Sequence, residues 1–507
     1  MKILVLEHPR IASEKRFNDI ANTPLWSCLM GGYAAAALAR EGFDTEFLDH
    51  AVPGADFNTT KEKILALNPD FLCVNAVYFW EHTPVLFDFF TSLRQHGFSG
   101  HLNLFGFFPS LVHKEILLNC DCVDSIAVGE FEHSLVELAK ALDRGQSFDN
   151  IQGLASKFGF SGTCRRQPEK NPDRFAFPKR SSLERTAAVL ASRGCYNHCS
   201  FCPVPSFYNQ GSLWKGRSPE NIAKEVQELV DQGIKDFYFV DPNFIGPGKT
   251  GKKRVMALMN LFVPMDIRFG IETRPQDLDD DILAELVAAG FQSLLMGVES
   301  GSAAVLNQIN KSAGPHVASR AISLCRKHGI EPEIGFLMFV PDARLDDLFE
   351  NMKFLMENNL LARLDRTANL LSHTQIVLAG TLGYRRFEQE NRLVKNGIFG
   401  FEAEVTFFDP KVKWVAELVT FACHTLLRSM SDKNSPIYWK NTDNLISRRA
   451  NAFLKEESLA LLARAKTHSR DLGETAREKR KILNQVTAIL TQGMTKAKTS
   501  QVFAASL

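Results

Sequence analysis

The stretch ASRGCYNHCSFCPVPSF, residues 191–207, places Cys195, Cys199 and Cys202 within eight residues of one another. It continues from TAAVLAS (186–192), an apolar, Val-containing segment that predicts a buried strand. Thiolates at this density are typical of zinc sites and of iron–sulfur clusters. Three cysteines on a four-iron cluster leave one iron with an open coordination position, and an open position is typical of a catalytic metal.

Two other interpretations of the three cysteines remain open. His198 could supply a fourth ligand to zinc, but it lies beside Cys199 inside the loop and would strain a tetrahedral site. Three inert buried thiols are the remaining possibility. The spacing favours an open iron–sulfur cluster over zinc, and zinc over inert thiols.

The chain after the cysteines alternates predicted strands and helices. The sequence Ser218-Pro219-Glu220 is a helix start, with a serine cap, a proline at the first position and an acid in the first turn. The pattern predicts a full or partial parallel (β/α) barrel of the TIM type over residues 183–400, with its site at the strand carboxyl ends. The expected strands are 186–192, 236–241, 268–272, 293–300 and 333–341.

Residues 1–150 show a similar alternation and predict a doubly wound, Rossmann-like or flavodoxin-like parallel sheet. The expected strands are 3–5, 44–49, 70–77, 101–106 and 125–130, and the expected helices are 32–42, 61–68 and 134–142. Ligands of such sheets bind beyond the strand carboxyl ends. The candidate binding residues at those ends are Asn75, Ala76, Gly106, Gly129 and Glu130.

The remaining segments are expected to be a linker and a helical region. Residues 151–182 are polar and contain prolines, which predicts a linker or a small hairpin. Residues 401–507 are expected to be mainly helical, and this part could bind the substrate. An apolar stripe runs through Ile482, Leu483, Val486, Ile489 and Leu490 after the basic run 477–481. Packing in a core is the favoured role for the stripe, and binding to a membrane surface is the alternative.

Composition narrows the classes of function and location. A formal net charge of +1 gives no global field that would attract nucleic acid or an acidic partner. The N-terminus lacks the features of a secretory signal, and no apolar run reaches the ~18 residues of a membrane span. The cytoplasm is therefore the expected location, where ten cysteines are expected to be ligands, catalysts or buried thiols.

Several motifs together resemble the radical S-adenosylmethionine superfamily, in the branch with an N-terminal cobalamin-binding domain. They are CYNHCSFC (195–202), GRSPENIAKEV (216–226), FYFVDPNF (237–244) and the segment 270–311 with its GVESGS. The resemblance implies that the three cysteines hold a 4Fe–4S cluster and that its free iron binds S-adenosylmethionine. One electron would then cleave this cofactor to methionine and a 5′-deoxyadenosyl radical. The residues implied in binding S-adenosylmethionine are Phe201, Asp241, Glu272, Arg274 and Glu299.

The first domain resembles the cobalamin-binding domain of that branch through residues 26–50 and 123–142. Two departures stand out. The chain has no Asp-x-His-x2-Gly motif, so no histidine is predicted to bind cobalt. The loop FGFFPS (105–110) carries Phe107 where the family has glycine, and a phenylalanine does not allow the close backbone approach that glycine does.

The resemblance leaves several functions open. The first is a cobalamin-dependent enzyme that methylates an unactivated carbon of a small substrate, which could be apolar or lipid-like, with flavodoxin or ferredoxin as electron donor. The second is a radical cyclase, dehydratase or rearrangement enzyme without methyl transfer. A methylthiotransferase ranks low because the tail is predicted to be helical. A non-enzymatic metal or cobalamin sensor is the last alternative.

Overall fold

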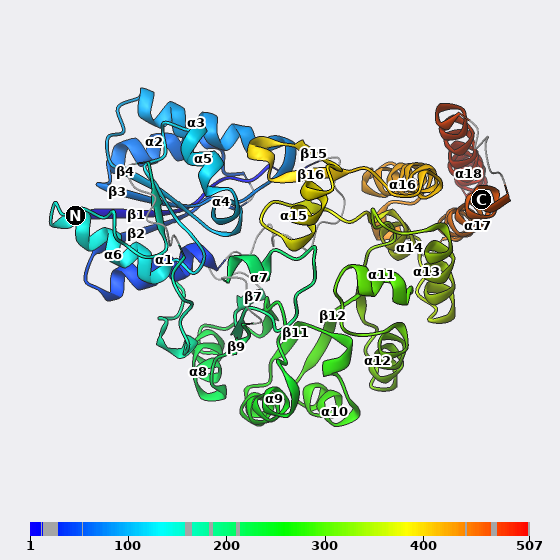
Figure 1. The fold of residues 1–507 in the computed structure, drawn as a ribbon. Coiled ribbons are helices and arrows are strands. Elements are labelled where there is room, and N and C mark those ends of the chain that lie inside the picture. The colour runs from blue at the N-terminus through cyan, green and yellow to red at the C-terminus, as the bar shows by residue number, and fades with distance from the viewer. Residues whose placement is uncertain are drawn as a thin grey trace.

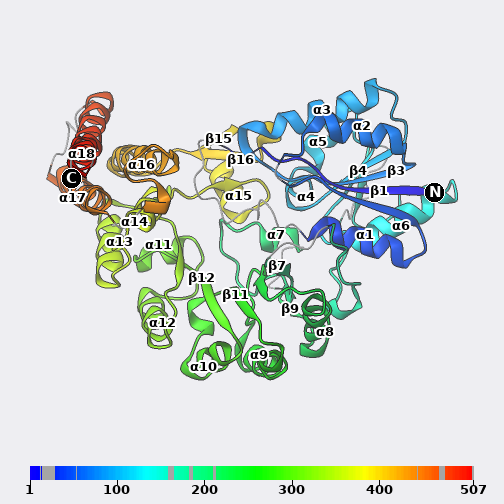
Figure 2. The same cartoon turned by 180° about the vertical axis from the view of Figure 1, so that it is seen from behind.

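The computed structural model describes most of the chain. The described residues are 1–11, 13, 29–52, 54–157, 165–181, 186–208, 213–441, 444–467 and 474–504, with side chains described up to 491. An N-terminal α/β unit lies beside a second α/β unit, and stacked helices follow at the C-terminal end (Figure 1). The opposite view shows the same arrangement and places the segment from α15 to β16 between the first sheet and the last helices (Figure 2).

The first sheet has the strand order β2-β1-β3-β4-β5-β6, and its first five strands run parallel. This order is that of the flavodoxin-like doubly wound fold, and it confirms the predicted fold class. β6 pairs antiparallel with β5 and lies within the segment expected to be a linker. The strands are β1 (Lys2–Glu7), β2 (Asp44–Asp49), β3 (Phe71–Asn75), β4 (His101–Phe105), β5 (Ser125–Ala127) and β6 (Leu154–Ser156).

The side chains of β1 point alternately to the two faces of this sheet and are buried on both. Leu4 and Leu6 belong to one hydrophobic cluster, and Ile3 and Val5 belong to the other. Burying each such side chain contributes roughly 1.5–3 kcal/mol to folding. The first cluster is covered by α2 (Phe57–Leu67), α3 (Thr83–Gln95) and α5 (His113–Asn119), and the second by α1 (Met30–Arg40) and α6 (Glu132–Asp143).

The second sheet has five parallel strands in the order β13-β12-β11-β10-β7, a partial barrel. A parallel bridge between Phe339 and Thr374 continues its pattern. α8 begins as predicted, since the Ser218 side chain accepts a hydrogen bond from the Asn221 backbone amide. The strands are β7 (Thr186–Val189), β10 (Asp236–Phe239), β11 (Arg268–Thr273), β12 (Phe291–Glu299) and β13 (Glu333–Phe336). The main helices are α8 (Pro219–Val230), α9 (Gly248–Phe262), α10 (Asp280–Ala288), α12 (Pro315–Lys327), α13 (Leu345–Glu357) and α14 (Leu364–Ser372).

A small antiparallel sheet after the barrel was not predicted. It comprises β14 (Val377–Leu378), β15 (Leu393–Asn396) and β16 (Glu402–Val405), and α15 (Leu382–Gln389) lies between its first two strands. The sheet packs on the core of the N-terminal unit, where Phe401 contacts Tyr78 and Phe108 at ring-centroid distances of 4.7 and 4.9 Å. Strands of two to four residues show too little alternation to be read from sequence.

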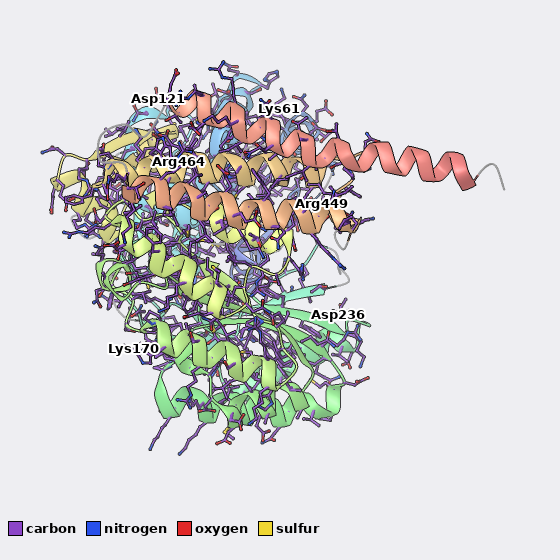
Figure 3. All side chains as sticks on the ribbon, turned by 90° about the vertical axis from the view of Figure 1, so that its right-hand side faces the viewer. Lys61, Asp121, Lys170, Asp236, Arg449 and Arg464 are labelled. Atoms are coloured by element: carbon purple, nitrogen blue, oxygen red, sulfur yellow. The ribbon has the colours of Figure 1, made fainter. Side chains whose placement is uncertain are left out.

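The C-terminal region is helical, as expected, and its three long helices lie side by side (Figure 3). They are α16 (Pro410–Ser431), α17 (Leu445–Thr467) and α18 (Thr475–Ala504). The apolar stripe of α18 packs in the core, because Ile482 and Val486 are almost fully buried, while Leu483 is 44% exposed. Across the described residues, no helix has both the length and the hydropathy needed to cross a membrane.

Candidate functional site

The cysteine loop begins at a glycine that the backbone requires. β7 is followed by β8 (Ser192–Arg193), which pairs antiparallel with β9 (Lys215–Gly216). Gly194 then turns the chain with a φ of +74°, and a Cβ atom there would lie 1.7 Å from the Leu213 carbonyl oxygen. Only glycine fits both the left-handed conformation and this close approach. Gly194 is therefore required at the start of the cysteine loop.

The loop is fixed by backbone contacts from two distant segments. The Ser200 amide donates to the Ile309 carbonyl at 2.8 Å, and the Ser200 carbonyl accepts from the Gly383 amide at 2.7 Å. The Asn310 side chain also donates to the His198 carbonyl at 2.8 Å. These bonds hold the loop between the end of α11 (Ala303–Gln308) and the start of α15.

The three thiols are partly buried and interact with one another. Burial raises the pKa values of the Cys199 and Cys202 thiols, and each is raised further by the charge of neighbouring cysteines. The Asn197 amide donates to the Cys199 sulfur at 2.9 Å. Such thiols lose their protons when a cationic metal group binds, because metal binding releases protons from its ligands.

A single metal ion and an iron–sulfur cluster need different arrangements of their protein ligands. Within the described part of the chain, no three His, Cys, Asp or Glu side chains converge closely enough to hold one ion. A four-iron cluster binds each thiolate at a different iron and does not need that convergence. Three thiolates without a fourth protein ligand are the donor set that leaves one iron of such a cluster open.

A buried ion pair lies beside the cysteines. The Glu299 carboxylate and the Lys311 ammonium are 2.9 Å apart, and both side chains are almost fully buried. Burial alone would lower the pKa of Lys311, but the charges of Glu299 and Cys199 outweigh it and raise that pKa. Lys311 was not among the candidate residues, although it ends the 270–311 segment that carries the family resemblance.

Arg274 lies against the same loop from β11. Its guanidinium is 4.6 Å from the centre of the Tyr196 ring and donates to the Ser312 hydroxyl at 2.6 Å. Tyr196 in turn donates to a carboxylate oxygen of Asp277. Arg274 and Glu299 are thus the two candidate residues that the structure brings next to the cysteines, with one cationic and one anionic group.

The other three candidates are arranged differently. Glu272 accepts a hydrogen bond from the Tyr238 hydroxyl at 3.2 Å, and burial raises its pKa to about 7. Asp241 is fully buried and accepts from the Ala191 amide at 3.0 Å, and burial raises its pKa to about 6. Asp241 thus fixes the end of the strand before the cysteine loop. Phe201 is partly buried against the barrel core.

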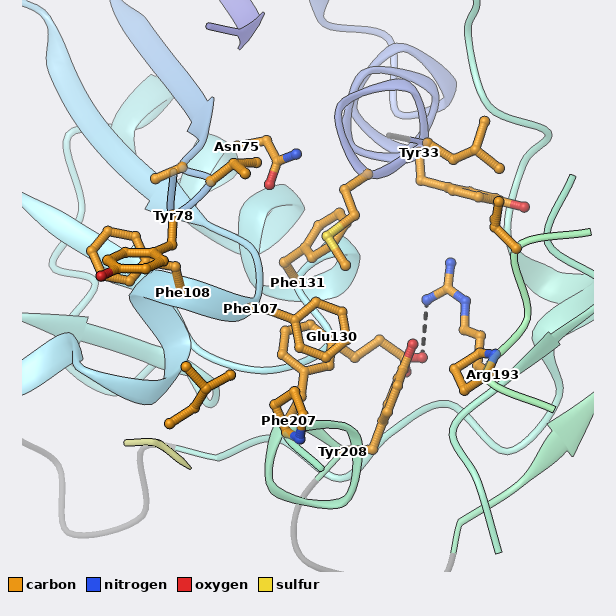
Figure 4. A pocket seen from close by; sticks show the side chains of 18 of the residues that line it. Tyr33, Asn75, Tyr78, Phe107, Phe108, Glu130, Phe131, Arg193, Phe207 and Tyr208 are labelled. Atoms are coloured by element: carbon orange, nitrogen blue, oxygen red, sulfur yellow. Dashed lines mark hydrogen bonds and ion pairs between the residues drawn. The ribbon is translucent and has the colours of Figure 1, made fainter. Parts of the chain in front are cut away.

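A cavity lies between the carboxyl edge of the first sheet and the mouth of the barrel (Figure 4). Its walls are mainly apolar and aromatic. Of the candidate residues of the first domain, Asn75, Ala76 and Glu130 line it. Its other walls come from α1, α4 (Phe107–Leu111), α7 (Val204–Phe207), the ends of β7 and β10, and the small sheet.

Gly106 and Gly129 do not line the cavity, but they lie against residues that do. Gly106 has a φ of +111°, and a Cβ atom there would lie 2.5 Å from the Asn75 side-chain oxygen. Gly129 has a φ of +81°, and its Cβ atom would lie 3.0 Å from the Phe207 carbonyl oxygen. Both glycines therefore allow protein groups that line the cavity to approach the backbone closely.

Polar groups fill the junction between β1 and β3 at the edge of the cavity. Asn75 donates to both carboxylate oxygens of Glu7, at 2.9 and 3.0 Å, and the Gly31 amide donates to one of them at 2.8 Å. Burial raises the pKa of Glu7 to about 7. The neighbouring His8 is also buried, and its Nε2 accepts from the Val77 amide at 3.1 Å, while burial lowers its pKa to about 3. Asn75 is therefore oriented by the protein itself.

Phe107 forms part of the cavity wall. Its ring stacks on Phe207 of α7 with centroids 4.1 Å apart and an interplanar angle of 25° (Figure 4). The residue that replaces the family's glycine thus joins the first domain to the short helix after the cysteine loop.

A charged cluster crosses the same interface. Arg193, two residues before Cys195, pairs with Glu130 at 2.9 Å and with Glu132 at 2.5 Å. Its guanidinium lies 3.9 Å from the centre of the Phe175 ring. Burial alone would lower the pKa of Arg193, but the two carboxylates outweigh it and raise that pKa. The cluster is buried and was not predicted as a unit.

Comparisons with known proteins place this site in context. Residues 189–355 match the model of the radical SAM superfamily. A curated relative, the uncharacterized methyltransferase PH0819 of Pyrococcus horikoshii, is 25% identical over 380 residues, which cover 70% of this chain and 77% of the relative. The anaerobic magnesium-protoporphyrin IX monomethyl ester cyclase of Rubrivivax gelatinosus is 24% identical, covering 66% of this chain and 62% of its own length.

Solved structures share the whole architecture. The cobalamin-dependent S-adenosylmethionine radical enzyme OxsB, solved with aqua-cobalamin and S-adenosylmethionine bound, has a TM-score of 0.75 at 17% identity and covers 100% of this chain and 81% of its own. The radical S-adenosylmethionine methyltransferase TsrM of Kitasatospora setae has a TM-score of 0.63 at 17% identity and covers 96% of this chain and 98% of its own. At these identities the likeness establishes the fold.

Proposed function

Residues 189–355 form a radical S-adenosylmethionine domain, and from this premise we propose a cobalamin-dependent enzyme that methylates an unactivated carbon of a small molecule. The cavity between the first sheet and the barrel mouth is the observation that carries this proposal. It lies where a flavodoxin-like sheet binds ligands, and the cysteine loop forms its far side through α7. The proposed units are a cobalamin-binding domain (1–150), a linker (151–182), a radical domain (183–400) and a helical, substrate-binding region (401–507).

The chain's residues suit a 4Fe–4S cluster and S-adenosylmethionine. Cys195, Cys199 and Cys202 would hold the cluster, which when bound supplies the electron that cleaves S-adenosylmethionine. Arg274 would donate to the carboxylate of S-adenosylmethionine, and Glu299 would accept from its ammonium group. Glu272, Asp241 and Phe201 complete the proposed set. Asp241 would act mainly through Ala191, because its carboxylate is fully buried.

The cavity suits the flat, largely apolar faces of a corrin ring. Asn75, Ala76 and Glu130 would contact it directly, with Gly106 and Gly129 holding the wall in place. When bound, cobalamin supplies the methyl group that the reaction transfers. The chain's contribution is to exclude water with its aromatic walls and to orient Asn75 through Glu7.

The proposed reaction also indicates a substrate and an electron donor. A small-molecule substrate would enter between the domains, and the apolar lining favours an apolar or lipid-like compound. The cluster needs an external reductant, for which a cytoplasmic flavodoxin or ferredoxin is the natural donor. Contact with a membrane surface would have to use the exposed side of α18, because its apolar stripe is packed in the core.

A second candidate is a radical cyclase or rearrangement enzyme without methyl transfer. Phe107 favours it, because its ring occupies the cavity wall where the resembling family has glycine. The cyclase relatives are consistent with this alternative.

Anaerobic reconstitution with iron, sulfide and hydroxocobalamin tests the proposal. We expect about four irons per chain, bound corrin, and formation of both S-adenosylhomocysteine and 5′-deoxyadenosine. Production of 5′-deoxyadenosine without bound corrin would favour the second candidate. One zinc without iron or sulfide would overturn both and support a metal sensor.

A further inference from the structure

Two free cysteines outside the cluster loop lie in one turn at the protein surface. Cys120 and Cys122 flank Asp121 between α5 and β5, and the Asp121 side chain is fully exposed (Figure 3). The Val123 amide donates to the Cys120 carbonyl at 3.5 Å, which closes the turn, and the two thiols interact by a hydrogen bond. Where the chain bends, Cα atoms two residues apart fall within the about 4.4–6.8 Å that a disulfide spans. The two sulfurs can therefore be joined without a large movement of the backbone.

The surroundings of this pair stabilise a thiolate. The hydrogen bond from the Cys120 thiol outweighs burial and lowers the pKa of Cys122 to about 7, and the Thr91 hydroxyl and the charge of Arg94 act in the same direction. Thr91 donates to the Cys122 sulfur at 3.9 Å, and Arg94 donates to the Cys122 carbonyl at 3.1 Å. The same hydrogen bond raises the pKa of Cys120. Near neutral pH the two sulfurs thus share one proton, and a thiolate is the form that attacks disulfides.

Other free cysteines differ from this pair in both burial and pKa. Cys73, Cys325 and Cys423 are buried, and burial raises the pKa of each thiol above its usual value. Cys120, in contrast, is only partly buried. Reactive cysteines are partly exposed and have a lowered pKa, whereas buried structural cysteines are inert. The turn between α5 and β5 therefore combines access, a thiolate and a second thiol.

We propose that Cys120 and Cys122 form a reversible dithiol–disulfide site that reacts with low-molecular-weight disulfides. The thiolate of the pair attacks one sulfur of the small disulfide, and the other half of that molecule leaves as a thiolate. The second cysteine attacks the resulting mixed disulfide, and its proton passes to the second departing thiolate. Two protein thiols are thereby oxidised to one disulfide, and one small disulfide is reduced to two thiols. The turn precedes β5 at the amino edge of the first sheet, whereas the cavity lies at the carboxyl edge, so the site is separate from the proposed radical chemistry.

Peptide mapping of the reconstituted, full-length protein in glutathione buffers tests this inference. Trypsin cleaves after Lys114 and Lys140, and the peptide 115–140 contains Cys120 and Cys122 as its only cysteines. After an acid quench and alkylation, the disulfide form of this peptide carries no alkyl group and the dithiol form carries two. At a fixed ratio of reduced to oxidised glutathione, diluting both tenfold should raise the ratio of disulfide to dithiol about 10-fold, because two thiols form for each small disulfide consumed.

Two variants and two internal controls complete the experiment. In Cys120→Ala and in Cys122→Ala the remaining cysteine should occur only as a thiol or as a glutathione adduct, whose yield does not change on dilution. Cys73 and Cys325 should stay reduced in the same digests, since both are buried. A wild-type peptide that remains a dithiol in excess oxidised glutathione would overturn the inference, and so would a ratio that dilution leaves unchanged. Oxidation of Cys73 or Cys325 to the same extent would also overturn it, because it would show unselective oxidation of an opened chain.

Discussion

Substitution of Gly194 by alanine should disable the cysteine loop without unfolding the protein. The new Cβ atom would lie 1.7 Å from the Leu213 carbonyl oxygen, whereas ordinary contact begins at 3.4 Å. The loop or the facing segment must therefore retreat by about 1.7 Å. Displacements of about 1 Å at a reacting centre cost about 100-fold in rate. The left-handed φ of +74° adds roughly 1–2 kcal/mol for a residue with a Cβ atom.

Gly233→Ala is the matched control. Gly233 has a φ of +93° after α8, and no atom lies within 4 Å of the position that its new Cβ atom would take, so this substitution has the backbone cost alone. Both variants should lose a few degrees of melting temperature, but only Gly194→Ala should lose iron and at least about 100-fold of the S-adenosylmethionine cleavage rate after reconstitution. Wild-type iron content and cleavage in Gly194→Ala would refute the reasoning.

Three further predictions concern buried groups. Lys311→Met should lower the free energy of unfolding by about 3–5 kcal/mol by leaving Glu299 buried and unpaired, whereas adding Glu299→Gln should restore most of the loss in denaturant titrations. Burial keeps His8 neutral in the folded protein, so the free energy of unfolding decreases as the pH falls below 6.5 and His8 of the unfolded chain takes up a proton. At pH 5 the wild type should have lost about 2 kcal/mol more of this free energy than His8→Gln. Parallel curves of stability against pH for the two proteins would contradict this. A double-mutant cycle of Phe107→Ala and Phe207→Ala should give a coupling of about 0.5–1.5 kcal/mol, and a value near zero would argue against the stacked pair.

Local patterns allowed the fold to be predicted. The buried run of β1 and the cap at Ser218 depend on neighbours within a few residues, and the structure has both. The spacing of the cysteines likewise favours a cluster-binding loop, and this assignment stays a prediction. Each of these signals lies within a short window of sequence, where periodicity and residue type carry the physical information.

Long-range features could not be predicted in the same way. Arg193 meets Glu130 and Glu132 from more than 60 residues away, and Tyr78 donates to Glu402 across 324 residues. No local sequence pattern in these segments indicates which distant residue each side chain will contact. The predicted linker likewise gave no sign of β6, because a strand of three residues has no measurable period.

The contact between Gly383 and the cysteine loop has a consequence for synthesis. Ser200 and Gly383 are 183 residues apart in the chain. At 5–20 residues per second, the ribosome delivers the second partner roughly 10–40 s after the first. During that interval the three thiols are present while the segment that clamps their loop does not yet exist. Cluster insertion is therefore expected after the chain is complete. Before that point, other metals or oxidants can react with the three thiols.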